Sequence, residues 1–197
     1  EAGLGTIKKA NRCLELNGVK LNEKKPQLTL TEGALKAAKL LLKDNYKTTV
    51  GLAIGSSEPA KQWGAQNFIH LIKSIRINYQ SQIVLIGGPN DYGIARSIKE
   101  NFDSPNWITQ AVGLPILEAS AAASLCNICI GNDTGILNIA AATGTFSIGL
   151  YIASIPQNDD PLIKPIIPAN ITTISTQNIE ALTNKMIIDT ISTVPGF

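Results

Sequence analysis

Short, continuous apolar runs alternate along this chain with longer segments in which apolar side chains recur every three or four residues. Runs such as 82–86 and 127–131 are typical of strands buried on both faces of a parallel sheet. The longer segments have the period of helices that pack on one side. Strands are predicted at residues 48–54, 82–86, 107–109, 127–131, 145–151 and 171–175. Helices are predicted at residues 7–21, 32–43, 65–77, 92–101, 115–125 and 178–191, with another between Gly135 and Gly144.

This alternation of strands and helices predicts an α/β fold, a Rossmann-like parallel sheet with helices on both faces. Thr31 is expected to cap the second helix, because its hydroxyl can accept a hydrogen bond from a free N–H of the first turn. Residues 156–168 hold four prolines and no helical pattern, so we expect them to form a surface crossover.

The length of 197 residues and a hydrophobic content of 44% allow one substantial core. We expect residues 47–197 to form that domain and residues 1–46 to be an N-terminal helical linker segment that packs on it. The opening helix has the character of a segment that follows another part of a fold. We therefore expect a preceding N-terminal portion that this sequence does not contain.

The net charge of +2 includes no block of Lys or Arg, and only 5% of the residues are aromatic. Both features argue against a nucleic-acid partner. No apolar run is long enough to span a bilayer, and no signal peptide is visible. We therefore expect a soluble, cytoplasmic protein without a transmembrane segment.

Cys126 and Cys129 have the spacing of redox and zinc motifs, but no second cysteine pair accompanies them and His70 is far away in sequence. The pair falls across a helix end and an apolar strand, where buried structural cysteines are typical. No cluster of metal-ligand residues is visible, so no metal site is predicted. His70 lies off the apolar stripe of its helix and is expected at the surface.

The sequence Gly131-Asn132-Asp133-Thr134-Gly135 connects an apolar strand directly to a helix. Free N–H groups and the positive end of the dipole at a helix N-terminus suit a diphosphate, and glycine allows close approach of the backbone. The alternative is that these polar residues only cap the helix, as Asp and Thr do in proteins of any function.

Two further strand-to-helix junctions carry polar residues. The first contains Ser56, Ser57 and Lys61, and the second, Gly87-Gly88-Pro89-Asn90-Asp91, ends in a carboxylate. The carboxyl ends of parallel strands share one edge of the sheet, so these junctions together predict a nucleotide site. The alternative for Lys61 is an ordinary solvated lysine. Neither a P-loop nor a Gly-x-Gly-x-x-Gly motif is present, which argues against an ATPase or a standard NAD enzyme.

Four motifs in order carry a resemblance to a known family. They are Gly-x5-Lys-x-Trp at 55–63, Gly-Gly-Pro-x-Asp at 87–91, a Gly-Leu-x-x-Leu-x-x-Ala-type stretch at 113–122 and Gly-Asn-Asp-Thr-Gly at 131–135. In this order they resemble the C-terminal half of family 9 glycosyltransferases, the ADP-heptose:lipopolysaccharide heptosyltransferases. The resemblance implies the donor-binding half of a GT-B glycosyltransferase.

The resemblance also implies an activity: inverting transfer of a heptose from ADP-heptose to lipopolysaccharide or another surface glycan. No cofactor or metal takes part, and the base that deprotonates the acceptor belongs to an N-terminal acceptor domain that this chain lacks. Such an enzyme works in the cytoplasm, peripherally at the inner membrane.

By position, Lys61 and Asp133 resemble the family's catalytic residues: Lys61 is matched to the leaving diphosphate and Asp133 to the sugar hydroxyls. The residues that the resemblance places around the donor are Ser56, Ser57, Lys61, Asp91, Asp133, Thr134, Gly135 and Asn138. Within this set, Asp91 is matched to the ribose. Asn138 stands where the family commonly has His, and Gln62 where it often has Arg; Asn138 can donate a hydrogen bond but cannot carry a proton.

Two alternatives stay open at this stage. One is another GT-B-like enzyme such as a nucleotide-sugar epimerase, for which more carboxylates and a histidine near the diphosphate are expected. The other is a non-catalytic nucleotide-binding or interaction module, which Asn138 and the absent acceptor domain favour.

Overall fold

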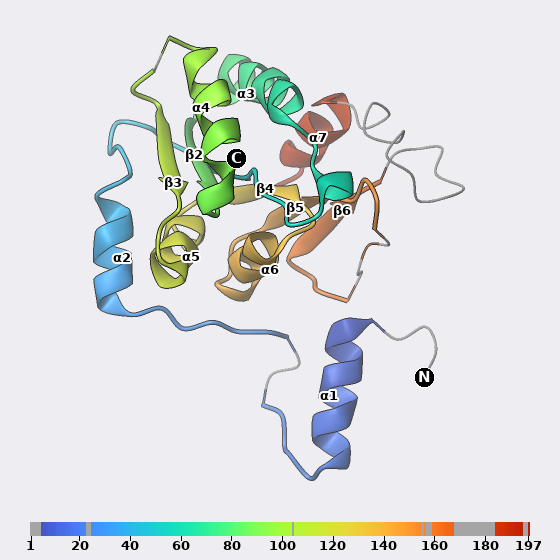
Figure 1. The fold of residues 1–197 in the computed structure, drawn as a ribbon. Coiled ribbons are helices and arrows are strands. Elements are labelled where there is room, and N and C mark those ends of the chain that lie inside the picture. Colours follow the sequence, from blue (N-terminus) through green and yellow to red (C-terminus); the bar gives the residue numbers. More distant parts are fainter. Residues whose placement is uncertain are drawn as a thin grey trace.

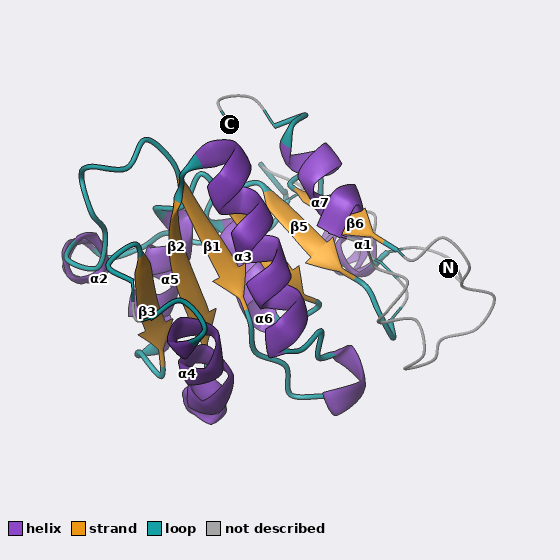
Figure 2. Cartoon of the chain, turned by 90° about the horizontal axis from the view of Figure 1, so that it is seen from above, coloured by secondary structure: helices purple, strands orange, loops and turns teal. Residues whose placement is uncertain are grey.

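A six-stranded, wholly parallel sheet in the order β3-β2-β1-β4-β5-β6 forms the centre of the molecule (Figures 1 and 2). The computed structural model describes residues 5–22, 25–103, 105–154, 156, 159–167, 184–194 and 197. The strands are β1 Thr49–Ala53, β2 Gln82–Gly87, β3 Ile108–Val112, β4 Ile128–Asn132, β5 Ser147–Leu150 and β6 Ile163–Ile166. All six strands run the same way, but the chain adds β2 and β3 on one side of β1 and β4, β5 and β6 on the other, so the strand order reverses between β1 and β4 (the β1–β4 reversal).

Helices cover both faces of the sheet, which confirms the predicted fold class (Figure 1). The helices are α1 Thr6–Leu16, α2 Glu32–Lys39, α3 Ala65–Tyr79, α4 Tyr92–Glu100, α5 Ile116–Ser124, α6 Gly135–Ala142 and α7 Asn184–Ile191. One face carries α3, α4 and α7, whose large aliphatic side chains pack on the sheet. The other carries α2, α5 and α6, whose buried surface consists largely of alanines. The short 3-10 helices η1 Pro59–Lys61 and η2 Pro89–Asp91 follow β1 and β2.

Predicted side-chain roles outside the site are confirmed. The Thr31 hydroxyl accepts a hydrogen bond from the Ala34 N–H at 3.3 Å and caps α2. His70 is exposed on α3. Cys126 and Cys129 are free and buried, and burial raises the pKa of the Cys129 thiol to about 12. Both cysteines are therefore structural.

The helix predicted at 32–43 ends earlier, because side chains from the sheet bind its backbone. The Gln82 amide accepts from the Lys43 N–H at 2.9 Å and donates to the Lys43 carbonyl at 3.1 Å, while the Thr109 hydroxyl donates to the Leu41 carbonyl at 3.0 Å. After Lys39 the N–H groups of residues 40–42 bond to carbonyls three residues back, and the Lys43 N–H goes to Gln82 in place of a helical carbonyl. Tertiary contacts thus override local helix propensity here.

The first helix also ends before the predicted residue. Gly18 has a φ of +77°, and the Val19 N–H donates to the Leu14 carbonyl, the pattern of a helix closed by a left-handed glycine. None of the residues of α1 is buried. In its first turn, the Ile7 N–H donates to the Asp159 carboxylate at 2.7 Å. In Figure 1, α1 lies apart from the layer formed by α5 and α6. The domain boundary at residue 46 stays a prediction.

The expectation that residues 156–168 form only a surface crossover is wrong, because β6 lies within them and pairs with β5. Pro165 is compatible with this strand because β6 is at the edge of the sheet, where the missing N–H breaks no ladder. The strand predicted at 171–175 lies outside the described residues, as does the first part of the helix predicted at 178–191.

The backbones of β1 and β4 approach so closely at Gly131 that a side chain there would collide with Ala53. A Cβ built on Gly131 would lie within van der Waals overlap of the Ala53 carbonyl oxygen, a backbone atom that cannot rotate away. Gly131 is therefore required by the contact between the two central strands.

We expect Gly131→Ala to lower the free energy of unfolding by about 1–3 kcal/mol, the usual effect of overpacking a rigid core. Urea denaturation measures this change. The matched control is Gly93→Ala, since Gly93 is exposed in α4 with open space around it. The control should raise stability by up to about 1 kcal/mol through helix propensity. Equal stability of the two variants would contradict the close approach.

Candidate functional site

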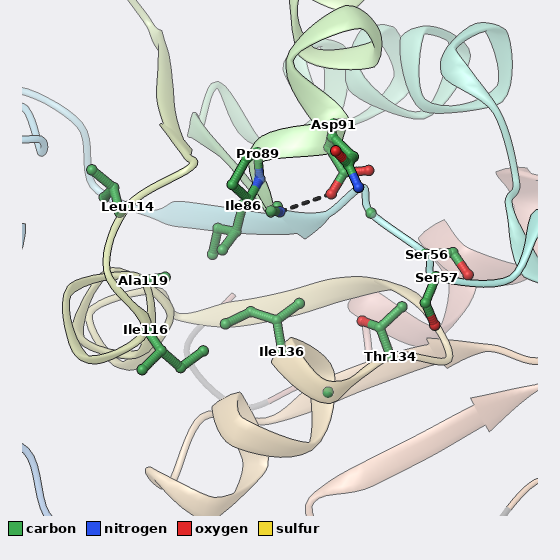
Figure 3. Close-up of a pocket in the computed structure, with 15 residues that line it drawn as sticks. Ser56, Ser57, Ile86, Pro89, Asp91, Leu114, Ile116, Ala119, Thr134 and Ile136 are labelled. Carbon is green, nitrogen blue, oxygen red and sulfur yellow. Dashed lines mark hydrogen bonds between the residues drawn. The ribbon is translucent and has the colours of Figure 1, made fainter.

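A cavity of about 440 Å³ opens at the carboxyl ends of the central strands (Figure 3). Its walls come from the segments that follow β1, β2, β3 and β4, so it lies beside the β1–β4 reversal where α/β sheets bind ligands. The lining residues are Gly55, Ser56, Ser57, Ile86, Gly87, Gly88, Pro89, Asn90, Asp91, Leu114, Ile116, Ala119, Thr134, Gly135 and Ile136. All three predicted strand-to-helix junctions thus meet at one cavity.

The two ends of the cavity differ in character. Figure 3 shows the hydroxyl-bearing Ser57 and Thr134 at one end and the apolar Leu114 and Ile116 at the other. Ile136 lies between them on the first turn of α6. The cavity therefore offers hydrogen-bonding groups to one part of a ligand and an apolar wall to another part.

The side chain of Asn132, the last residue of β4, connects the first and last of these junctions. It is completely buried, and its amide nitrogen lies 3.0 Å from the Ile54 carbonyl, 3.1 Å from the Gly55 carbonyl and 2.8 Å from the Gln62 side-chain oxygen. Its oxygen accepts from the Trp63 N–H at 3.1 Å. The loop after β1 is thereby fixed at both of its ends to the end of β4.

No side chain of the Asn132-Asp133-Thr134 turn caps α6 in the described structure. Asn132 is bound to the loop after β1, and Asp133 faces the loop after β5 and Lys61. Thr134 occupies the N-cap position, but its hydroxyl makes no capping bond. Within the described residues this hydroxyl is buried and has no hydrogen-bond partner. The alternative of a simple cap is therefore wrong, and the cavity-lining Thr134 has an unused hydroxyl.

The two serines of the first junction differ in what their hydroxyls do. The Ser56 hydroxyl donates to the Glu58 carbonyl at 2.9 Å and accepts from the Glu58 N–H at 3.2 Å, which holds the loop in a turn. Ser57 is exposed, and its hydroxyl has no hydrogen-bond partner in the part of the chain that the structure describes. Ser57 is thus the serine whose hydroxyl is available to a ligand.

Asp91 lines the cavity but also holds the loop after β2. Its carboxylate accepts from the Gly88 N–H at 2.8 Å (Figure 3), and the residue is only 9% exposed. Side chains at Gly55 or Gly87 would collide with this carboxylate. The glycines of two predicted motifs are therefore explained by the space that Asp91 occupies.

Lys61 and Asp133 lie together, with 3.4 Å between Nζ and Oδ2, but neither is among the residues that line the cavity. The Lys61 ammonium also contacts Glu58 Oε1 at 2.7 Å. The hydrogen bond to Glu58 and the nearby Asp133 raise the pKa of Lys61, and partial burial opposes them. Lys61 is therefore a fully charged group held between two carboxylates.

Asn138 does not face the cavity in this structure. It is exposed on α6, and its amide donates to the Thr134 carbonyl at 3.0 Å, one helical turn earlier. Of the predicted site residues, the cavity brings together Ser56, Ser57, Asp91, Thr134 and Gly135. Lys61, Asp133 and Asn138 are not part of its lining.

Several residues of the site were missed by sequence reasoning. Asn132 and Ser154 hold other site residues by side-chain contacts between distant segments, which no local pattern indicates. Glu58 contacts Lys61 from three residues earlier in the same loop. The apolar wall had a usable signal, because Leu114 and Ala119 lie in the third of the four motifs.

Two further findings concern metals and membranes. Among the described residues, no group of three or more His, Cys, Asp or Glu side chains is placed to hold a metal ion. None of the described helices combines the length and apolar composition that crossing a bilayer requires.

We expect Asn132→Ala to lower the free energy of unfolding by about 2–4 kcal/mol, because each buried group left without a partner costs about 1–3 kcal/mol. Denaturant unfolding gives this value. The control Asn138→Ala removes an exposed amide from the same region and should change stability by less than about 0.5 kcal/mol. An Asn132 variant as stable as the control would show that the amide does not hold the two junctions together.

Comparison with known proteins places the chain in a family. The family described as Glycosyltransferase family 9 (heptosyltransferase) matches residues 9–185. Lipopolysaccharide heptosyltransferase 2 of Salmonella typhimurium is 29% identical over 143 residues, which are 70% of this chain and 40% of that protein. The chain thus spans less than half the length of this curated relative.

Two solved structures share the fold. A family 9 glycosyl transferase from Veillonella parvula superposes with a TM-score of 0.79 at 21% identity, covering 98% of this chain and 60% of that one. The E. coli ADP-heptose lps heptosyltransferase II superposes with a TM-score of 0.73 at 22% identity, covering 86% and 53%. These superpositions confirm the expected fold, one half of the GT-B architecture. Because the family match spans most of the sequence, the chain belongs to glycosyltransferase family 9, the heptosyltransferase family.

Proposed function

We propose that this chain is the donor-binding half of an inverting glycosyltransferase that transfers heptose from ADP-heptose to a lipopolysaccharide core or another surface glycan. The observation that carries the proposal is the unpartnered Thr134 hydroxyl at the N-terminus of α6, on a cavity at the β1–β4 reversal. A buried hydroxyl without a partner is unfavourable unless a ligand completes its hydrogen bonds.

The diphosphate of the donor binds at the polar end of the cavity. The first N–H groups of α6, beginning with Gly135, have no acceptor within the helix and carry the positive end of its dipole. The hydroxyls of Ser57 and Thr134 donate to phosphate oxygens from the two sides of this end. What supports the arrangement is that both hydroxyls are without partners among the described residues.

The nucleoside binds toward the apolar end. Leu114, Ile116 and Ala119 offer a wall against which a planar base can pack. Asp91 lines the same cavity and uses Oδ2 to bind the Gly88 N–H, and we assign its other oxygen to a ribose hydroxyl. Adenine is proposed as the base because the E. coli structure with the same fold is described as an ADP-heptose enzyme.

In the proposed reaction the acceptor hydroxyl attacks the anomeric carbon and the bond from that carbon to the β-phosphate oxygen breaks. Negative charge then develops on the leaving ADP, where the dipole of α6 and the Lys61 ammonium stabilise it without a metal ion. Lys61 is flexible enough to exchange its contact with Glu58 for the diphosphate. The acceptor's proton goes to a base that we assign to an N-terminal acceptor domain.

The partners follow from the same proposal. The acceptor is a lipopolysaccharide or related glycan, and the reaction takes place in the cytoplasm, peripherally at the inner membrane. The name of the Salmonella relative supports this class of acceptor.

Isothermal titration with ADP, UDP and GDP, without added metal and with EDTA, tests the diphosphate site. We expect the chain to bind ADP. Thr134→Val should lower the affinity for ADP about 5–10-fold, because the variant loses one hydrogen bond of about 1–1.4 kcal/mol. The control Thr143→Val removes a hydroxyl from the other end of α6 and should leave the affinity unchanged. Equal affinities of the two variants would remove Thr134 from the site, and binding abolished by EDTA would contradict the metal-free proposal.

Lys61 and Glu58 should have opposite effects on the same titration. Lys61→Met should weaken ADP binding by about 1.5–3 kcal/mol, the contribution of a charge-assisted hydrogen bond. Glu58→Gln should strengthen it by up to about 1 kcal/mol, because it removes the carboxylate that competes for Lys61. Lys36→Met on α2 is the control for loss of a lysine charge. If Glu58→Gln weakens binding as Lys61→Met does, the exchange of partners is wrong.

A further inference from the structure

Ser154, in the loop that follows β5, also contributes its side chain to the site, although the sequence analysis gave this residue no role. The Ser154 hydroxyl donates to Asp133 Oδ2 at 2.7 Å, across 21 residues of sequence. Ser154 is half-buried and Asp133 is 22% exposed at its side chain, so the bond is partly shielded from water. It joins the carboxyl ends of β5 and β4 beside the cavity.

The two hydrogen-bonding partners of the Asp133 carboxylate, Ser154 and Lys61, contact the same oxygen. Oδ2 accepts from Ser154 and faces Lys61 Nζ at 3.4 Å, and no described residue donates to Oδ1. A carboxylate has two oxygens with about four acceptor sites between them. Two donors from different loops on one oxygen fix the plane of the carboxylate and leave Oδ1 free to accept from a ligand.

The chemistry of Asp133 limits which part of a donor it can contact. An ionised carboxylate only accepts hydrogen bonds, so it cannot bind a phosphate oxygen and is repelled by one. It precedes Thr134 and Gly135, which the proposed function places on the diphosphate. Of the groups on the nucleotide-sugar that lie near Asp133, those that can donate a hydrogen bond are therefore the hydroxyls of the sugar attached to the β-phosphate.

We infer that Ser154 is a positioning residue that orients Asp133 so that Oδ1 accepts a hydrogen bond from a hydroxyl of the donor sugar. This inference rests on the proposed function and deepens it. Its consequence is selectivity: Ser154 increases affinity for the nucleotide-sugar and does not affect affinity for the nucleoside diphosphate alone.

The test is the titration of ADP-heptose and of ADP into the full 197-residue chain and its Ser154 variants. We expect Ser154→Ala to lower the affinity for ADP-heptose about 5–10-fold, the effect of one lost hydrogen bond. The affinity for ADP should fall less than about twofold. Ser154→Thr keeps the hydroxyl and should restore the affinity for ADP-heptose. Ser124→Ala removes a half-buried hydroxyl on α5 away from Asp133 and should change the affinity for neither ligand.

A double-mutant cycle separates positioning from a general structural effect. If Ser154 acts through Asp133, Ser154→Ala should have no further effect on ADP-heptose binding in an Asp133→Ala background. Weakening of both ligands by the same factor, or of neither, would overturn the role of Ser154 while leaving the diphosphate site in place. Failure of the unsubstituted chain to bind ADP would instead overturn the proposed function together with this inference.

Discussion

The arrangement of the site depends on the buried side chain of Asn132. A parallel sheet presents the ends of its central strands side by side, but the loops that follow them are not held by the ladder. One amide at the end of β4 binds the Ile54 and Gly55 carbonyls and the Trp63 N–H, and so fixes the loop after β1. This contact requires Gly131, because a larger residue would force the two strands apart.

The same constraint leaves the N-terminus of α6 open. A side chain that is fully used in joining two loops cannot also cap the helix that follows it. With Asp133 turned toward Ser154 and Lys61, the first turn of α6 keeps its free N–H groups and the unpartnered Thr134 hydroxyl on the cavity. Positive potential and hydrogen-bond donors are thus concentrated where the diphosphate of a nucleotide-sugar is proposed to bind.

Much of the fold could be predicted from the sequence, because its determinants are local. Buried strands have continuous apolar runs, and packed helices have apolar residues at a regular spacing. The exceptions have identifiable physical causes. Side chains of Gln82 and Thr109 end α2 early. Pro165 argued against a strand because proline has no N–H for the ladder, but β6 is an edge strand, where that N–H is not needed.

That the three polar junctions meet at one cavity could also be predicted, since strand-to-helix junctions share one edge of a parallel sheet. The partners of its side chains could not. Ser56 and Ser57 are adjacent and chemically identical, yet only Ser57 has a free hydroxyl, because a turn uses the other. Likewise, nothing near Lys61 in sequence indicates that it also contacts the distant Asp133. These differences arise from contacts between loops, which only the folded arrangement shows.

The central claim is that the open N-terminus of α6, held in place by Asn132, receives a diphosphate. A crystal structure of this chain with bound ADP tests it most directly. We predict phosphate oxygens within hydrogen-bond distance of the Thr134 hydroxyl and the Gly135 N–H, with the adenine toward Leu114 and Ile116. ADP bound elsewhere, or bound with the Thr134 hydroxyl still unpartnered, would contradict the account.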